Sequence, residues 1–206
     1  KGVESYEPMP AFFGSQVFAF AKNFSPLGEK LKRDHCPLVF LKPVWSVTNE
    51  DTALDLTPFT AIGAKVWGES ELAFTVGENL KPSWVTVAND VTMHFPDLDQ
   101  DNHLPYFKGQ RGFLPISDKV YPAEILSNYR IKSISDGQVV REGGSAEIHY
   151  TAEEMLSWLM TWATVKSGDL VLVGSPLRFS GHIYVSPGSR FEIELNGEIV
   201  MTTNFT

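Results

Sequence analysis

The chain has 206 residues, enough for one domain with its own hydrophobic core. Its formal net charge of −8 argues against nucleic acid or an anionic membrane as a partner, because both attract basic surfaces. No apolar run reaches the length of about 18 residues that a membrane-spanning helix needs. Cys36 is the only cysteine, so no disulfide can form within the chain, which is typical of a reducing compartment. We therefore expect a cytoplasmic protein.

Short β-strands dominate the pattern from the N-terminal to the C-terminal end, and we expect a mainly β fold with few short helices. Two dipeptides, Asp136-Gly137 and Asn196-Gly197, are typical of tight hairpin turns between neighbouring strands. In chain order the expected strands are residues 16–21, 38–41, 64–76, 84–88, 129–134, 138–141, 170–173, 183–185, 190–195 and 198–202.

One segment has the apolar period of a helix. Thr151 is the expected N-cap, with Glu154 three residues later completing a capping box. Apolar side chains then recur at helical spacing as far as Ala163, which predicts a helix packed on the core. A weaker pattern predicts a second helix over residues 27–33. Since no linker or repeat divides the chain, we expect an N-terminal extension over residues 1–15 and a single domain over residues 16–206.

Glu69 and Glu71 are separated by one residue in the longest expected strand, and alternate side chains of a strand share a face. Leu72, Phe74 and Val76 then point to the other face, into a core. Two carboxylates so close together repel and raise each other's pKa unless a cation lies between them. A hard divalent cation with oxygen ligands fits this requirement, whereas the alternative is a strand face exposed to solvent.

A third carboxylate, Asp90, follows the next strand along the chain. If that strand returns beside the first, it brings Asp90 to the two glutamates. Three carboxylates leave open positions on Mg²⁺ for substrate oxygens, and a 2-oxo acid can chelate the ion through its carboxylate and keto oxygens. The ion then stabilises an enolate as it forms.

A series of short motifs in a fixed order resembles the fumarylacetoacetate hydrolase family. The resemblance covers residues 16–205, and two stretches, Leu104–Lys108 and Met160–Asp169, are similar to the family's carboxymethyl-oxo-hexenedioate decarboxylase/isomerase branch. The motifs are Lys22-Asn23-Phe24, Leu38 to Pro43, Glu69-x-Glu71-Leu72-Ala73, Asn89-Asp90-Val91-Thr92, Lys108 seven residues before Pro115, Gly168-Asp169 and Gly174-Ser175-Pro176.

The resemblance implies a mixed β-sandwich roll and a homodimer. It also implies Mg²⁺, Mn²⁺ or Ca²⁺ held by Glu69, Glu71 and Asp90, with Lys108 as a catalytic lysine that neutralises charge on the substrate. Ser175 stands where the family usually has Thr, Gln110 where relatives often have Arg or an aromatic residue, and His94 where they often have Arg. The residues implied to bind substrate are Ser175, Gln110, Asn23 and His94.

Two departures from the family pattern bear on the reaction. Leu27 stands where the family's hydrolases carry a His that deprotonates water. In those hydrolases the His pairs with a Glu, which is Glu29 here, the second candidate catalytic residue. Glu29 therefore lacks its His partner unless His35 substitutes for it. The segment between Glu71 and Asp90 is also shorter than usual. We therefore expect a metal-dependent enzyme for a small 2-oxo acid or 1,3-diketo acid, with decarboxylation or isomerisation favoured over C–C hydrolysis. The alternatives are a degenerate, non-catalytic family member that binds an oxo acid, and an unrelated β-sandwich binding module.

Overall fold

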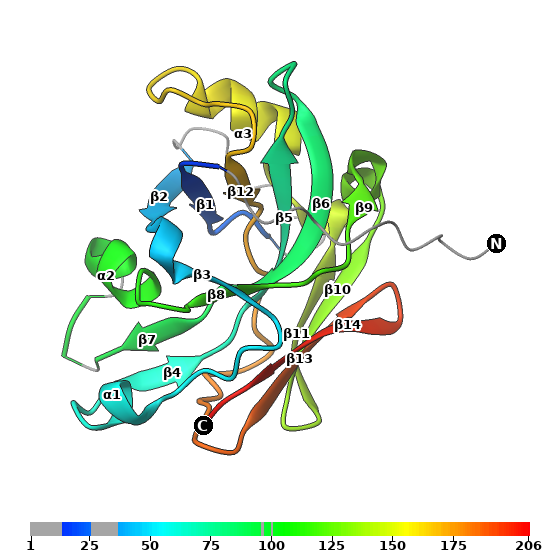
Figure 1. Ribbon diagram of the computed structural model, residues 1–206. Helices are drawn as coiled ribbons and strands as arrows, with labels where there is room; N and C mark the ends of the chain where they lie inside the picture. The colour runs from blue at the N-terminus through cyan, green and yellow to red at the C-terminus, as the bar shows by residue number, and fades with distance from the viewer. Residues whose placement is uncertain (1–13, 26–36, 96, 100) are drawn as a thin grey trace.

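The computed structural model of the protein describes residues 14–25, 37–95, 97–99 and 101–206. Its strands form an eight-stranded sheet, a four-stranded sheet and a two-stranded sheet (Figure 1). The path of the largest sheet is β2 (Leu38–Lys42), β1 (Val17–Ala21), β12 (Leu170–Leu172), β5 (Ser70–Val76), β6 (Pro82–Asn89), β8 (Leu114–Ile116) and β3 (Val47–Asn49), with β9 (Tyr121–Pro122) paired to β6. The second sheet has the order β11 (Gln138–Gly144), β10 (Arg130–Ser135), β13 (Arg190–Leu195) and β14 (Glu198–Asn204). The third pairs β4 (Lys65–Trp67) with β7 (Thr92–His94).

Helices are few and short in the described residues, and the expected mainly β fold is confirmed. The α-helices are α1 (Thr57–Thr60), α2 (Leu104–Lys108) and α3 (Ala152–Leu159). Four 3₁₀ turns, η1 to η4, span Val44–Ser46, Asp101–His103, Ala123–Ser127 and Ser145–Glu147. α2 lies beside β2 and β7, whereas α3 lies at the far end of β5 (Figure 1).

The hydrophobic core has two parts, one on each face of the largest sheet. Leu72 and Phe74 of β5 belong to the larger part together with Phe191 of β13, so this part joins the two main sheets. Ala73 of the same strand belongs to the smaller part, with Leu170 of β12. Because β5 is buried on both faces, its apolar residues run nearly without interruption, as in sheets covered on both sides.

The two predicted hairpins are present, and the strand Arg190–Leu195 has the predicted bounds. At the second turn Asn196 and Gly197 have φ values of 52° and 90°, and Asp136 and Gly137 at the first have 47° and 80°. Turns with two left-handed residues match the twist of the flanking strands, which is why Asn-Gly and Asp-Gly occur there.

The capping box of α3 is confirmed by two reciprocal hydrogen bonds. The Glu154 amide donates to Thr151 Oγ1 at 3.3 Å, and the Thr151 amide donates to Glu154 Oε2 at 3.0 Å. The α-helix nevertheless ends at Leu159, and the prediction that it reaches Ala163 was wrong. Met160 at the C-cap is 45% exposed, so core packing does not prolong the helix beyond this point.

Two other predicted elements differ from the structure. The single strand over 64–76 is divided at Gly68 into β4 and β5, which belong to different sheets. A Cβ atom at Gly68 would lie 2.7 Å from Phe191 Cδ2, so the backbone passes too close to the core for any side chain. Residues 183–185 form no strand, and only Val185 makes an isolated bridge, to Val66. The helix expected at 27–33 lies outside the described residues.

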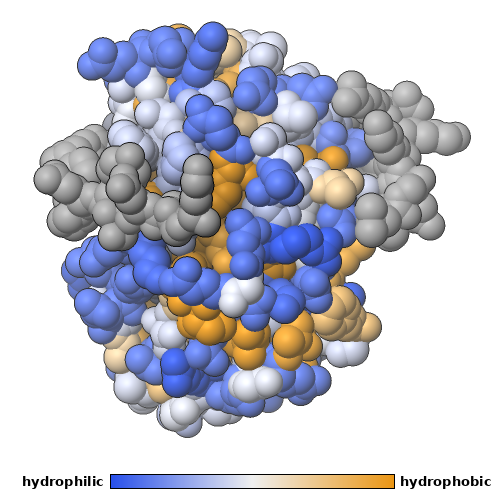
Figure 2. All heavy atoms as spheres, turned by 90° about the vertical axis from the view of Figure 1, so that its right-hand side faces the viewer, coloured by the Kyte–Doolittle hydropathy of each residue, from blue (hydrophilic) through white to orange (hydrophobic). Residues whose placement is uncertain are grey.

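Hydrophilic side chains cover much of the side of the molecule seen in Figure 2. On the side where β9, β10 and β14 lie, hydrophilic side chains surround a central band of apolar ones (Figure 2). Within the part of the chain that the structure describes, no helix combines the length and the apolar character needed to cross a bilayer.

Candidate active site

The three predicted metal ligands lie together. A carboxylate oxygen from each of Glu69, Glu71 and Asp90 lies within 4.8 Å of the others. Antiparallel pairing of β5 with β6 sets Glu71 opposite Ala88, and the Asp90 amide donates to the Glu69 carbonyl oxygen at 2.8 Å. Glu71 is 3% exposed and Asp90 is 1% exposed, so the alternative of a solvated strand face does not apply.

Neighbouring polar groups hold the backbone and side chains of this carboxylate cluster. The Glu69 amide donates to Asn89 Oδ1 at 3.0 Å, and the Gly174 amide donates to Glu71 Oε2 at 2.9 Å. Gly174 has a φ of 97°, and a Cβ there would lie 3.0 Å from the Phe20 carbonyl oxygen. A glycine at this position therefore lets a backbone amide face the buried carboxylate.

Lys108 lies in the middle of the cluster, as its predicted role requires. Its Nζ donates to Asp90 Oδ2 at 2.6 Å, to Glu69 Oε2 at 2.8 Å and to Thr92 Oγ1 at 2.6 Å. Lys108 is the last residue of α2, and its ammonium lies 5.9 Å from the ring centre of Phe40. Burial opposes the charged form, but the carboxylates of Asp90, Glu69 and Glu71 raise the pKa of Lys108 above its usual value. The ammonium is therefore charged and can bind an anion.

Two further basic residues complete the cluster, although neither was predicted to belong to it. Lys42 Nζ lies 2.5 Å from Asp90 Oδ1 and also donates to the carbonyl oxygens of Lys108 and Phe113. Arg141 Nη2 donates to Glu69 Oε1 at 2.6 Å, and its Nη1 donates to the Pro176 carbonyl oxygen at 2.8 Å.

Sequence signals for these two residues existed but were weak. Lys42 stands in the family-like motif before Pro43, and Arg141 is the last residue of the predicted strand over residues 138–141. Which face of each strand is buried, and against which carboxylate, depends on contacts between distant parts of the chain.

The three carboxylates differ in their electrostatic surroundings. Burial favours the neutral form of Glu69, but Arg141 and Lys108 outweigh it and hold its pKa well below the usual range. Burial raises the pKa of Glu71 well above its ordinary value, and the charges of Asp90 and Glu69 add to this effect. Glu71 makes no ion pair with the described part of the chain. A cation near Glu71 would therefore relieve a specific electrostatic penalty.

A pocket of about 200 Å³ opens onto this cluster. Ser175 lines it, and the Oγ atom of Ser175 is buried with no hydrogen-bond partner within the described structure. A buried hydroxyl normally has a partner, so this one is oriented for a group from outside the chain. The remaining walls come from Phe20, Ala21, Lys22, Phe40, Leu104, Pro176, Leu177 and Arg178.

The donor set fits a hard divalent cation. All three candidate ligands are carboxylates, which Mg²⁺ and Mn²⁺ accept, and a carboxylate that already accepts hydrogen bonds keeps further lone pairs. Glu69, Glu71 and Asp90 would hold such an ion, with Ser175 and Lys108 beside it. The ion would polarise a keto oxygen of the substrate.

Three residues implied to bind substrate do not line this pocket. Asn23 is 1% exposed, and its side chain bonds to backbone atoms of Val173 and Tyr150. Gln110 Nε2 donates to the Tyr106 carbonyl oxygen at 2.6 Å. The Asn23 amide thus holds backbone from distant parts of the chain, the Gln110 amide holds backbone one turn away, and substrate contact by either residue stays a prediction.

His94 is the third such residue. Its ring packs edge-on against Trp67 and Phe107, and Nε2 lies 3.3 Å from the Leu98 carbonyl oxygen. The ring therefore covers the side of the two-stranded sheet rather than facing the pocket. Glu29, Leu27 and His35 lie outside the described residues, so the part of the prediction that concerns them stays a prediction.

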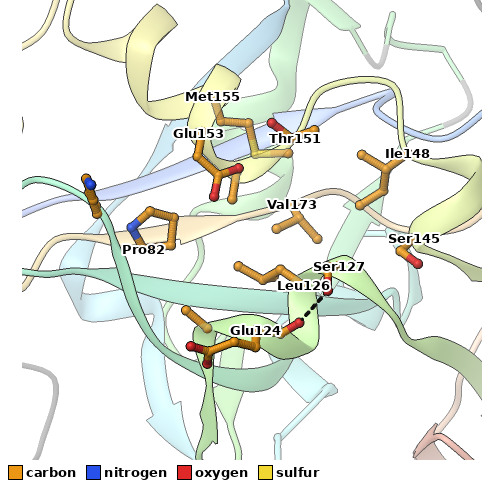
Figure 3. A pocket seen from close by; sticks show the side chains of 13 residues that line it. Pro82, Glu124, Leu126, Ser127, Ser145, Ile148, Thr151, Glu153, Met155 and Val173 are labelled. Carbon is orange, nitrogen blue, oxygen red and sulfur yellow. Dashed lines mark hydrogen bonds between the residues drawn. The ribbon is translucent and has the colours of Figure 1, made fainter.

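A second pocket, of about 600 Å³, lies between α3, η3 and the β5–β6 hairpin. Figure 3 shows Met155, Leu126 and Val173 around it, with Glu124 and Glu153 on different sides. Among the described residues, no group of three metal-ligating side chains lies here, since the cluster at Glu69 is the one found. The smaller pocket is therefore the candidate active site despite its size.

Comparison with known proteins identifies the family of the chain. Residues 16–205 match the family described as Fumarylacetoacetate (FAA) hydrolase C-terminal. The chain belongs to this family. The family recognised from the motifs, and the fold that it implies, are therefore confirmed.

Two of the relatives are named as enzymes of oxaloacetate. The chain is 29% identical to the mitochondrial oxaloacetate tautomerase of Saccharomyces cerevisiae, over 92% of this chain and 82% of that protein. It is 26% identical to the mitochondrial oxaloacetate decarboxylase of Dictyostelium discoideum, over 89% and 90%. The prediction of an enzyme of this family agrees with these names. The predicted cytoplasmic location stays a prediction, since both relatives are named as mitochondrial.

Solved structures share the fold at low sequence identity. The 5-carboxymethyl-2-hydroxymuconate delta-isomerase from Mycobacterium smegmatis has a TM-score of 0.74 and 21% identity, over 93% of this chain and 78% of that one. A maleylpyruvate hydrolase from Sphingobium, solved with manganese and pyruvate, has a TM-score of 0.70 and 17% identity, over 93% and 70%.

Proposed function

We propose that this chain is a divalent-metal-dependent enzyme that converts a small 2-oxo acid by stabilising its enolate, through tautomerisation or decarboxylation. The observation that carries the proposal is the cluster of Glu69, Glu71 and Asp90 around Lys108 in one pocket. The names of the relatives, oxaloacetate tautomerase and oxaloacetate decarboxylase, support the choice of reaction.

The residues of the chain have distinct tasks in this proposal. Lys108 places a fixed positive charge beside the position where negative charge develops on the substrate oxygen, and such preorganised charge stabilises the transition state. Ser175 Oγ donates to a substrate oxygen, which gives this buried hydroxyl its missing partner. Arg141 and Lys42 form ion pairs with Glu69 and Asp90 and hold these two carboxylates in place.

Tautomerisation and decarboxylation need an electron sink and a group that moves a proton, whereas C–C hydrolysis also needs an activated water. Leu27 in place of the family's His favours the first two reactions over hydrolysis. We further propose Mg²⁺ as the metal and a homodimer as the assembly, because the family resemblance implies both. The cytoplasm is the proposed location.

Calorimetric titration of the protein with Mg²⁺ and oxalate, an enolate mimic, tests the proposal. We expect oxalate to bind only when Mg²⁺ is present, and Mg²⁺ affinity to fall at least about 100-fold in Glu71→Gln, because one anionic ligand is lost. Glu78→Gln is the matched control, since Glu78 is exposed and lies outside the pocket. Turnover of oxaloacetate in its enol form should depend on the same ion.

Two results would contradict the proposal. Oxalate binding that does not need the metal, or that survives Glu71→Gln unchanged, would remove the metal site. Metal-dependent oxalate binding without turnover of any oxo acid would favour the non-catalytic family member instead.

A further inference from the structure

Two arginines stand side by side at the wall of the candidate active site. Arg141 of β11 pairs with Arg178 in an isolated antiparallel bridge, and the Phe179 amide donates to the Val140 carbonyl oxygen at 3.2 Å. Side chains of residues directly opposite each other in such a bridge extend on the same face. Arg141 reaches Glu69 on this face, so Arg178 emerges beside it, and Arg178 lines the same pocket.

The two guanidinium groups differ in what balances their charge. Arg141 is ion-paired with Glu69 and hydrogen-bonded to the Pro176 carbonyl oxygen. Arg178 makes no ion pair with a carboxylate among the residues that the structure describes, and the charge of Arg141 lies next to it. Like charges directly opposite each other destabilise a strand pair. An anion at Arg178 would remove this cost.

The carboxylates on the other side of Arg178 already form ion pairs with Arg130. Arg178 also lines a neighbouring pocket of about 190 Å³ that contains Glu142 and Glu147. Both of these glutamates pair with Arg130, with nitrogen–oxygen distances of 2.8 Å. The pocket of about 190 Å³ is lined by these two acidic groups, so an anion is favoured on the other side of Arg178, which faces the metal-ligand cluster.

A chain of contacts orients the Arg178 guanidinium. Its Nη1 lies against both ring nitrogens of His182, Nε2 and Nδ1, with 2.6 Å to Nδ1, and the His182 ring lies against Trp67 with 4.0 Å between ring centres. Trp67 Nε1 in turn donates to Glu69 Oε1 at 2.9 Å. Burial and Arg178 lower the pKa of His182 to about 4, so its ring is neutral and can accept a hydrogen bond from the guanidinium. Arg178 is thus positioned relative to the carboxylate cluster.

We propose that Arg178 is the specificity-determining residue of this site, and that its guanidinium binds the second carboxylate of a 2-oxo dicarboxylic acid. This inference rests on the proposed function, which places the 2-oxo carboxylate end of the substrate at Glu69, Glu71 and Asp90. Guanidinium groups bind carboxylates through two parallel hydrogen bonds, which gives geometric selectivity as well as charge recognition. On a chain with a net charge of −8, the overall field does not attract a dianionic substrate, so local cations such as Arg178 must bind its second charge.

A pair of matched acids tests the proposal in the Mg²⁺-loaded protein. Calorimetry compares 2-oxoglutarate with 2-oxohexanoate, an unbranched monoacid of matching length that lacks the second carboxylate. We expect the diacid to bind about 10- to 100-fold more tightly in the unmodified protein, as for a hydrogen-bonded ion pair. In Arg178→Gln this ratio should fall to near one, and in Arg178→Lys part of it should return.

Arg190→Gln is the control, because Arg190 is an exposed arginine paired with Glu192 on β13, outside both pockets. Taking the ratio of two dissociation constants cancels any general effect of a substitution on folding. A ratio that stays high in Arg178→Gln, or that is near one in the unmodified protein, overturns the role of Arg178 while Mg²⁺-dependent oxalate binding still supports the proposed function. Absence of oxalate binding in the unmodified protein overturns both.

Discussion

Arg141 Nη2 lies 2.6 Å from Glu69 Oε1, in an ion pair that links the four-stranded sheet to the residue just before β5 of the eight-stranded sheet. The side chains of the pair are 9% and 13% exposed, so water screens it little. One contact therefore joins the two main sheets and fixes the orientation of a proposed metal ligand. The same geometry places Arg141 next to Arg178 at the wall of the pocket.

Replacing Arg141 by Met should destabilise the fold. Glu69 would lose one of its two cationic partners while remaining nearly buried, and removal of one member of a buried ion pair costs about 3 kcal/mol of unfolding free energy. Urea denaturation followed by circular dichroism measures the change. Arg130→Met is the control, because Arg130 is 50% exposed and its ion pairs contribute less than about 1 kcal/mol each. Equal losses in the two variants would show that the Arg141 pair is no stronger than a surface one.

Replacing Lys108 by Met should lower the turnover number by about 100- to 1,000-fold, the usual effect of removing one preorganised group that stabilises transition-state charge. Lys119→Met serves as the control, since Lys119 pairs with Glu198 at the surface, with side chains 46% and 74% exposed. Steady-state kinetics with oxaloacetate gives both values. A Lys108→Met protein that is folded and retains full turnover would exclude the proposed role of this ammonium.

Asp169 belongs to a family motif but should act on stability rather than on catalysis. It is fully buried, and its two oxygens accept from the backbone amides of Gln16 and Lys166 and from the Gln16 side chain. Asp169→Asn turns an NH₂ group toward these donors and should cost about 2 kcal/mol. Thermal unfolding measures this loss, with the exposed Asp118→Asn as control. Loss of metal binding in folded Asp169→Asn would contradict a purely structural role.

The protonation of His182 should make the fold sensitive to acid. Burial, followed by the charge of Arg178, lowers the pKa of His182 from its ordinary value of 6.5 to about 4 in the folded protein. A depressed pKa means that the folded state favours the neutral ring, so this contribution to stability is complete above pH 6.5 and is lost as the pH falls toward 4. NMR titration of the histidine rings should find His182 neutral at about pH 5.5.

The same titration in Arg178→Gln isolates the part of the shift that Arg178 causes. We expect the pKa of His182 to rise in this variant but to stay below its ordinary value, because burial remains the larger cause. His149 is the internal reference within each spectrum. An unchanged pKa of His182 in Arg178→Gln would mean that the guanidinium does not lie against this ring.

Local chemistry in the sequence was enough to predict much of this protein. Asn196-Gly197 specifies its hairpin because both residues tolerate positive φ, and Thr151 with Glu154 specifies the start of α3 through hydrogen bonds between near neighbours. The grouping of Glu69, Glu71 and Asp90 also followed from the sequence. The return of β6 beside β5, with a backbone hydrogen bond from Asp90 to Glu69 just outside the two strands, brings these carboxylates together.

Only the tertiary structure decided which other side chains reach the carboxylates. Lys42 and Arg141 come from strands far away in the chain, and no local period shows which buried carboxylate each one meets. The motif of Asn23 predicted a substrate contact. In the structure its side-chain amide donates to the carbonyl oxygens of Tyr150 and Val173, which lie 127 and 150 positions further along the chain. Short-range propensities act within a few residues, whereas burial and charge pairing depend on how whole sheets pack against each other. The sequence alone therefore determined both hairpins, the start of α3 and the grouping of the three carboxylates, whereas packing decided where the longest predicted strand divides and which cations surround the carboxylates.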